Sequence, residues 1–365
     1  ETLSFGKEEG WFERWREEHE ACRNAVALFD MSFMSKFLIQ GRDAASFLNY
    51  LSTANVTSDN TITYTQWLTE DGYVEADLTV TKLPNKTYLV VATDTAHTRV
   101  LTHMKRHLRS PTDNVTITDM TGAYTQINLQ GPRSRDLLVK TTTTPDIVVS
   151  LPFRGVAEID VGYAKVYVTR ITYVGELGYE LYIPTASAVH VYETIVAAGE
   201  EFGLTHAGLK ALGSLRLEKA YRDYGHDMDN TDTLRDVGLS FTCDMSQEFL
   251  GKEALLRQNA AAKRRGGLQK RLVQVLVRDE GPVLHHGEIL WRDGERISEV
   301  RSGSYGFTLG GGVGLSMVEN RSDGGVVNKA WLNEGRWEVQ IGNEFYPVQI
   351  SLAPLYDPKN ERVKG

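Results

Sequence analysis

The stretch ITYVGELGYELYIP, residues 171–184, combines a glycine-rich turn with a strand that follows it directly. Two glutamates, Glu176 and Glu180, lie in this short segment among glycine and aromatic residues. Turns that carry Tyr and Glu often line ligand sites, because a rigid scaffold presents functional groups on its loops. Such segments are also often only turns, so the pattern by itself leaves both interpretations open.

A second informative stretch is YVEADLTV, residues 73–80. Successive side chains of a strand point to opposite faces, so the apolar residues from Val74 to Val80 share one face and Asp77 lies on the other. Asp is disfavoured within strands. Asp77 is therefore predicted either to meet solvent or to point into a polar cavity, and the pattern does not choose between them.

Hydrophobic spacing outlines the rest of the chain. Trp11, Trp15, Cys22, Val26 and Phe29 recur at helical intervals, which predicts an amphipathic helix over 11–29. After residue 265 the chain turns to short strands with frequent glycine and no strong helix pattern, as is typical of a small antiparallel barrel. We therefore expect an α+β region followed by an all-β region of about 100 residues. Between them the pattern predicts strands at 37–41, 73–80, 88–93, 125–130, 164–171 and 179–183, and helices near 94–108, 186–203 and 206–222.

Charge and motif content exclude several function classes. Among 365 residues, 40 are Lys or Arg and 48 are Asp or Glu, a net charge of -8 that argues against a nucleic-acid binder. The basic run KRRGGLQKR (263–271) is best interpreted as a solvated linker rather than a binding patch. No apolar run is long enough to span a membrane. The two cysteines form no CxxC pair, so no metal site is expected. A dinucleotide-binding GxGxxG after a strand, a phosphate-binding loop and a GxSxG elbow are all missing from the sequence.

Colinear segments across nearly the whole chain resemble the aminomethyltransferase (glycine cleavage T-protein) family, and most closely its branch at the C-terminal end of sarcosine and dimethylglycine dehydrogenases. The resemblance implies a three-lobed, cloverleaf-like α+β fold with a C-terminal antiparallel β-barrel. It places a bilobed folate-binding region at 1–265 and the barrel domain at 266–365. The segments are ACRNAVALFDMSFMSKF (21–37), DGYVEADLTV (71–80), NLQGP (128–132), YVGELGYELYIP (173–184), SLRLEKAYRDYG (214–225), VGLSFTC (237–243), FLGKEAL (249–255) and LYDPKNERVKG (355–365).

The same resemblance implies a tetrahydrofolate site and assigns residues to it. The position of Asp77 matches the family's aspartate that approaches the reacting nitrogens of the pterin, which makes Asp77 the catalytic candidate. Tyr64 matches a tyrosine of the site, Tyr173 and Glu180 match residues that hold the pterin edge, and Tyr221 falls where an aromatic side chain lines the pocket. The implied reaction captures an iminium or formaldehyde from N-methyl amine oxidation and forms 5,10-methylenetetrahydrofolate.

Two departures from the family pattern bear on this assignment. Leu212 stands where T-proteins carry an arginine that helps to bind the pterin, which argues against a true glycine cleavage enzyme. Nothing in the chain corresponds to the flavin domain of the dehydrogenases, so no FAD site is expected here and an FAD-dependent oxidoreductase is the expected partner. Two alternatives stay open: a T-protein that transfers an aminomethyl group, and a non-catalytic regulatory subunit of the pyruvate dehydrogenase phosphatase type. The expected compartment is the mitochondrial matrix in a eukaryote and otherwise the cytoplasm.

Overall fold

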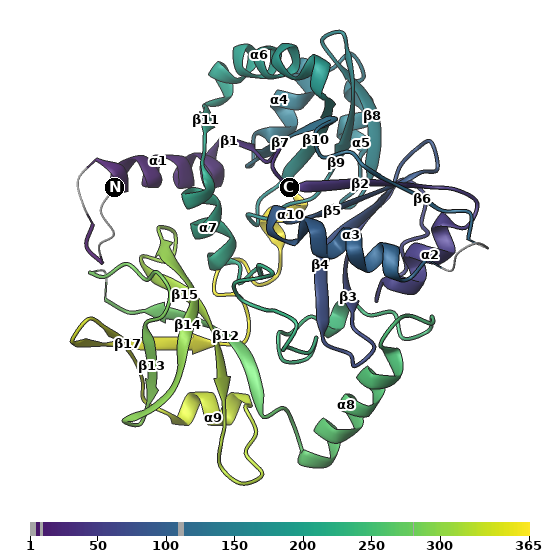
Figure 1. Cartoon of the computed structure of the whole chain (residues 1–365). Coiled ribbons are helices and arrows are strands. Elements are labelled where there is room, and N and C mark those ends of the chain that lie inside the picture. The colour runs from purple at the N-terminus through teal and green to yellow at the C-terminus, as the bar shows by residue number, and fades with distance from the viewer. Residues whose placement is uncertain (1–4, 8–9, 109–112, 280) are drawn as a thin grey trace.

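The computed structural model describes residues 5–7, 10–108, 113–279 and 281–365, and its strands form two open sheets and a closed barrel (Figure 1). One sheet has the order β3-β4-β5-β2-β6 and the other has the order β11-β1-β7-β10-β9-β8. The barrel closes in the order β12-β15-β14-β13-β16-β17. This arrangement confirms the predicted α+β class with a C-terminal antiparallel barrel.

The strand bounds show that the barrel is built from the last third of the chain. The five-stranded sheet contains β2 (Ser35–Gln40), β3 (Thr61–Leu68), β4 (Val74–Lys82), β5 (Tyr88–Ala92) and β6 (Thr116–Asp119). The six-stranded sheet contains β1 (Val26–Asp30), β7 (Tyr124–Gln130), β8 (Val156–Val161), β9 (Ala164–Thr169), β10 (Gly178–Pro184) and β11 (Leu204–His206). The barrel contains β12 (Lys270–Val277), β13 (Ile289–Arg292), β14 (Glu295–Gly306), β15 (Gly311–Glu319), β16 (Trp337–Ile341) and β17 (Glu344–Ser351).

Helices cover the sheets and connect them to the barrel. They are α1 (Trp11–Asn24), α2 (Ala44–Leu51), α3 (His97–Arg106), α4 (Ser134–Thr141), α5 (Pro145–Ser150), α6 (Ala188–Gly199), α7 (Leu209–Glu218), α8 (Lys252–Arg265), α9 (Lys329–Glu334) and α10 (Glu361–Lys364). Helix α9 lies within the barrel region, where the hydrophobic spacing does not predict a helix. Its side-chain cap is Asn328, which accepts a hydrogen bond from the Trp331 amide.

The prediction of one helix over 11–29 is wrong at its C-terminal end. Helix α1 stops at Asn24, and Val26 and Phe29 belong to strand β1. Strand β1 pairs with β11 on one side and β7 on the other, so its first four residues are all buried. A strand covered in this way reads as a continuous apolar run, whose spacing can also fit a helix.

The basic run at 263–271 is only partly a connection. Residues Lys263–Arg265 form the last turn of α8, and Gly266 caps the helix with φ 87°. Cations in a last turn interact favourably with the helix dipole, and a left-handed C-terminal residue is the position that glycine suits best. The connection to the barrel is therefore the short segment 266–269.

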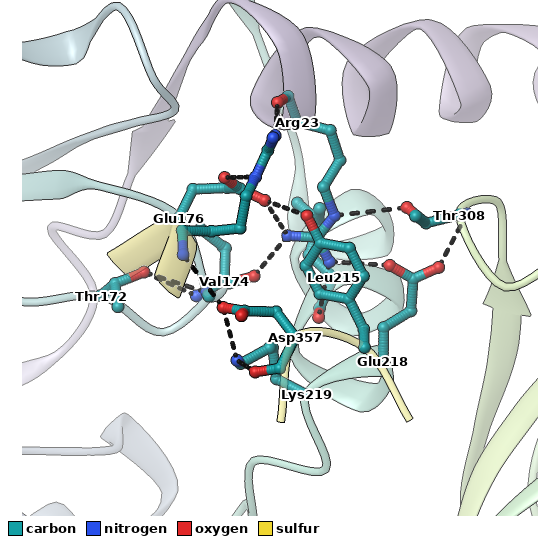
Figure 2. A network of polar contacts seen from close by, with 12 residues as sticks. Arg23, Thr172, Val174, Glu176, Leu215, Glu218, Lys219, Thr308 and Asp357 are labelled. Carbon is teal, nitrogen blue, oxygen red and sulfur yellow. Dashed lines mark hydrogen bonds and ion pairs between the residues drawn. The ribbon is translucent and has the colours of Figure 1, made fainter. Parts of the chain in front are cut away.

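The chain after the barrel returns to the middle of the molecule, where α10 lies beside the sheets (Figure 1). There a buried polar network joins α1, α7 and this C-terminal segment (Figure 2). Arg23 contacts Glu176 at 3.1 Å and Glu218 at 2.7 Å, and its guanidinium lies over the ring of Tyr356, 4.0 Å from the centroid. Arg362 reaches Glu176 at 2.9 Å. Charges buried this deeply need partners, so the network fixes how these segments meet.

Candidate active site

The stretch 171–184 requires glycine at two positions where the chain enters strand β10 (Gly178–Pro184). Gly175 has φ 83°, a left-handed conformation that glycine adopts without strain. A Cβ at Gly178 would lie 1.9 Å from Oε1 of Gln130. The turn therefore directs its two glutamates to different places: Glu176 into the buried ion network, and Glu180 onto the strand. The functional interpretation of this stretch consequently concerns Glu180, because Glu176 has a structural role.

Asp77 occupies the polar face of β4, where the structure confirms the predicted alternation of buried and partly exposed residues. Its neighbour across the β3–β4 pair is Gln66, which donates a hydrogen bond from Nε2 to Oδ1 of Asp77 at 2.7 Å. The hydroxyl of Thr242 donates to the other end of the same amide, at Oε1. An amide whose oxygen is already bonded presents its NH₂ group to the carboxylate, so Thr242 fixes the orientation of Gln66.

Burial is the main influence on the acidity of Asp77. It raises the pKa of this carboxyl from 3.8 to about 7, while hydrogen bonds from Gln66 and Tyr64 pull the pKa down. The negative charge of Asp223 raises the pKa further, and the positive charge of Arg222 lowers it. A carboxyl with a pKa near neutrality exists in both protonation states at pH 7, which suits a general base.

Three tyrosines lie near this carboxyl. Two of them interact with it electrostatically, and the third stacks on one of these two. Burial raises the pKa of the Tyr64 phenol, and the charge of Asp77, its hydrogen bond to Tyr64 and the charge of Tyr173 raise it further. Tyr173 donates its hydroxyl to the carbonyl of Arg222 at 2.7 Å. The rings of Tyr173 and Tyr221 are stacked, with centroids 6.1 Å apart and planes 12° apart. The structure thus brings Tyr64, Asp77, Tyr173 and Tyr221 into one neighbourhood.

Glu180 lies in a separate polar group on the six-stranded sheet. Its carboxylate accepts hydrogen bonds from Tyr182 at 2.7 Å and from Asn128 at 3.4 Å. Burial raises the pKa of Glu180, and the charge of Lys36 opposes this shift. Lys36 is itself fully buried, with a pKa lowered to about 8 by burial. The described contacts of Glu180 include none of Tyr64, Asp77, Tyr173 and Tyr221.

Two polar atoms beside Glu180 are buried without a hydrogen-bond partner among the described residues. They are Oε1 of Gln126 and Oγ1 of Thr169. Gln126 also donates to Asn128, and Thr169 is the cross-strand neighbour of Glu180. Buried polar atoms are almost always satisfied in folded proteins. Together with the Glu180 carboxylate, these acceptors suit a flat ligand with several N–H donors on one edge.

The structure accounts for Leu212, the residue that departs from the family pattern. Its side chain lies in an apolar cluster with Phe12 and Trp15, so it offers no polar contact to a ligand. Arg216, one turn later on α7, is occupied by an ion pair with Asp227. The cation of the Asp77 neighbourhood is instead Arg222, which donates to the carbonyls of Val237 and Ala220, each at 2.8 Å.

Sequence reasoning missed several polar residues of this neighbourhood. Gln66 lies two residues after Tyr64 and on the same face of the strand. Strand periodicity could therefore have identified Gln66 as a site residue. Arg222 directly follows Tyr221, but nothing in the sequence shows that its charge acts on Asp77. Asp223 follows in turn, and its burial raises its own pKa. Among the described residues, no group of three or more His, Cys, Asp or Glu side chains could hold a metal ion.

Comparisons with known proteins assign the fold to a class and the chain to a family. Residues 2–247 match the GCVT N-terminal domain, and residues 270–357 match the glycine cleavage T-protein C-terminal barrel domain. The crystal structure of glycine cleavage system aminomethyltransferase T from Bartonella henselae has the same fold, with a TM-score of 0.78 and 22% identity over 93% of this chain and 89% of that one. The chain belongs to the aminomethyltransferase (glycine cleavage T-protein) family.

Curated relatives include enzymes much longer than this chain. The 4-methylaminobutanoate oxidase (formaldehyde-forming) of Paenarthrobacter nicotinovorans is 37% identical over 99% of this chain and 42% of its own length. Mitochondrial sarcosine dehydrogenase of Mus musculus is 33% identical over 94% of this chain and 38% of its own length. The chain therefore spans about two fifths of either relative. In the part of the chain that the structure describes, no helix is long and apolar enough to cross a membrane.

Proposed function

We propose that this chain binds tetrahydrofolate and uses it to capture a one-carbon unit released by oxidation of an N-methyl amine, with 5,10-methylenetetrahydrofolate as product. The observation that carries the proposal is the Asp77 carboxyl, held by Gln66 beside Tyr64 with a pKa of about 7. Similarity to a formaldehyde-forming oxidase and to a sarcosine dehydrogenase supports the nature of the one-carbon donor. When bound, tetrahydrofolate supplies the two nitrogens that take up the carbon.

Asp77 handles the proton of this reaction. A nitrogen that attacks an iminium or formaldehyde carbon forms a C–N bond and must lose a proton, and the Asp77 carboxylate accepts it. The same carboxyl, now protonated, would return that proton to the departing group: an amine nitrogen leaves as the neutral amine, whereas the oxygen from formaldehyde becomes a hydroxyl group. When the ring closes, the carboxylate would accept the proton of the second nitrogen, and in the formaldehyde reaction it would pass this second proton to the hydroxyl group, which leaves as water. General acid–base catalysis of this kind contributes about 10²–10⁴-fold to a rate.

The remaining site residues bind and orient the pterin in this proposal. Glu180 accepts N–H donors from the aminopyrimidine edge, and the unpartnered Oε1 of Gln126 and Oγ1 of Thr169 lie beside it as further acceptors. The stacked Tyr173 and Tyr221 offer an aromatic wall. Enclosure also protects an iminium or formaldehyde from loss to water. An FAD-dependent oxidoreductase unit is the proposed source of that carbon.

Calorimetry with tetrahydrofolate and with 5-formyltetrahydrofolate tests the binding directly. We expect saturable binding of both compounds by the isolated chain. Absence of binding at millimolar ligand would overturn the proposal. A parallel assay that supplies either formaldehyde or an aminomethyl-loaded lipoyl carrier distinguishes one-carbon capture from aminomethyl transfer, and Leu212 favours the first.

A further inference from the structure

Three arginines from separate segments meet around residues 236–237. The side chain of Arg222, which follows α7, donates from Nε to the carbonyl of Val237 at 2.8 Å. The amide of Leu272 donates to the carbonyl of Asp236 at 2.7 Å, which holds the start of β12 against the same segment. Arg235 precedes Asp236 and Arg271 precedes Leu272. The backbone therefore brings Arg222, Arg235 and Arg271 together.

These arginines lack the carboxylate partners that several other buried arginines have. Arg23, Arg216 and Arg301 each form an ion pair with a carboxylate. In contrast, Arg222, Arg235 and Arg271 have no carboxylate within ion-pair distance in the described part of the chain. Arg222 bonds to backbone carbonyls, and Arg235 bonds to Oδ1 of Asn259 at 3.0 Å.

The charges of Arg222 and Arg235 act on Arg271, in agreement with this backbone arrangement. Burial lowers the pKa of Arg271, and the positive charges of Arg235 and Arg222 lower it further. All three side chains are partly buried. The chain has 48 acidic residues against 40 basic ones, so carboxylates are not scarce. A partly buried group of like charges with no carboxylate at ion-pair distance among the described residues is suited to binding an anion.

The position of the arginines indicates where such an anion would lie. Arg222 adjoins the Asp77 site, because its charge lowers the pKa of the Asp77 carboxyl. Arg235, at the other side, lines a surface hollow of about 550 Å³ together with Asn259 and Lys263 of α8. The group thus extends from the proposed pterin site toward the surface.

We propose that Arg222, Arg235 and Arg271 form a carboxylate-binding subsite next to the Asp77 site, and that it holds the glutamyl tail of the reduced folate. This inference rests on the proposed function, since it takes the occupant of the Asp77 site to be a folate. The tail carries its carboxylates at the end of the molecule remote from the pterin. Guanidinium groups bind carboxylates through paired hydrogen bonds, so three of them suit a tail with several glutamyl units.

The test compares the binding of ligands with and without the glutamyl tail. The proteins are wild type, the variants Arg271→Gln and Arg235→Gln, and the control variant Arg264→Gln. Arg264 is an exposed cation at the end of α8 outside the group. Calorimetry uses 5-formyltetrahydrofolate with one or three glutamyl units, a tetrahydropterin without a tail, and p-aminobenzoyl-triglutamate without a pterin. N-methylglycine serves as the other possible source of a carboxylate.

We expect the triglutamate to bind wild type about tenfold more tightly than the monoglutamate, the scale of one charged hydrogen bond. Arg271→Gln and Arg235→Gln should abolish that preference, leave tetrahydropterin binding unchanged and match Arg264→Gln in stability. Equal weakening of tetrahydropterin binding, or no effect of tail length in wild type, would overturn the subsite. The subsite would also be overturned if the main effect of Arg271→Gln and Arg235→Gln were a loss of N-methylglycine binding. In that case the arginines would bind the carboxylate of the substrate and not that of the folate tail. If wild type binds no pterin but binds p-aminobenzoyl-triglutamate in an Arg271-dependent manner, the proposed function fails and the arginine subsite stands.

Discussion

Gln66 and Asp77 face each other across the β3–β4 pair, and the 2.7 Å hydrogen bond from Nε2 of Gln66 to Oδ1 of Asp77 links strand register to site chemistry. A shift of one residue in this register would turn Asp77 toward the apolar core. The core residues of β4 oppose such a shift, because Val74, Ala76 and Leu78 are all buried. Packing of one face of β4 therefore positions the carboxyl on the other.

Asp77→Asn tests the role of this carboxyl most directly. The substitution nearly preserves shape and removes the base, so folate binding should persist while formation of 5,10-methylenetetrahydrofolate slows by at least about 100-fold. The assay supplies formaldehyde and subtracts the uncatalysed condensation. Glu75→Gln is a matched control, because Glu75 lies on the same strand face but bonds to Arg99 at 2.7 Å. An Asn variant that turns over like wild type would make Asp77 a structural residue.

The raised pKa of Asp77 predicts opposite pH trends for activity and stability. Activity should rise as pH increases through about 7, because only the carboxylate accepts a proton. In the folded chain the group holds its proton up to about pH 7, whereas the unfolded chain releases it near 3.8. Its contribution to stability is therefore fully present below about pH 4 and declines toward pH 7. Urea unfolding of wild type and Asp77→Asn at several pH values measures this contribution. The free energy of unfolding of wild type should fall relative to that of the variant as pH rises. A difference that stays constant with pH would contradict the assigned pKa.

Glu180→Gln should weaken folate binding by roughly 1–3 kcal/mol, the usual effect of removing one charged hydrogen-bond partner. Calorimetry with 5-formyltetrahydrofolate provides the measurement. Tyr182→Phe is the companion variant, since Tyr182 donates to the same carboxylate without being placed against the ligand. If Glu180→Gln lost no more folate affinity than Tyr182→Phe, Glu180 would have a structural role.

The buried network of Figure 2 makes Glu176 a stability residue. Glu176→Gln removes one of the two carboxylates that pair with Arg23, and it removes the carboxylate that pairs with Arg362. Removing one member of a buried ion pair costs about 3–5 kcal/mol, and we expect a loss of that size in urea unfolding. Glu13→Gln removes an exposed pair with Arg16 on α1 and should cost under about 1 kcal/mol. Equal losses in the two variants would show that the network does not stabilise the fold.

Local patterns predicted the fold where a single periodicity dominated. The alternation in β4 was sufficient to place Asp77 on a polar face, and the glycine-rich strands after residue 265 indicated the barrel. The pattern at 11–29 failed, because the buried strand β1 continues the apolar spacing of α1.

The candidate site needed tertiary information that local patterns do not contain. The resemblance named Tyr64, Asp77, Tyr173 and Tyr221, which the structure brings together, but it did not reveal that Glu180 lies in a different polar group. Arg222 and Arg271 come from separate segments, and only the backbone bond between Asp236 and Leu272 shows that they converge.

Gln66→Leu provides a test of how the site sets the acidity of Asp77. Gln66 is fully buried, and its hydrogen bond is the largest influence that lowers the pKa of the carboxyl. A hydrogen bond to the charged form favours ionisation, so its removal should raise the pKa of Asp77 above 7. The pH–rate profile should then move upward by about one unit, the scale of one hydrogen bond to a charged group. Thr242→Val removes the bond that orients the Gln66 amide, so it should shift the profile in the same direction by less. A merely structural role would lower the rate equally at every pH, and an unchanged midpoint in Gln66→Leu would therefore show that Gln66 does not tune Asp77.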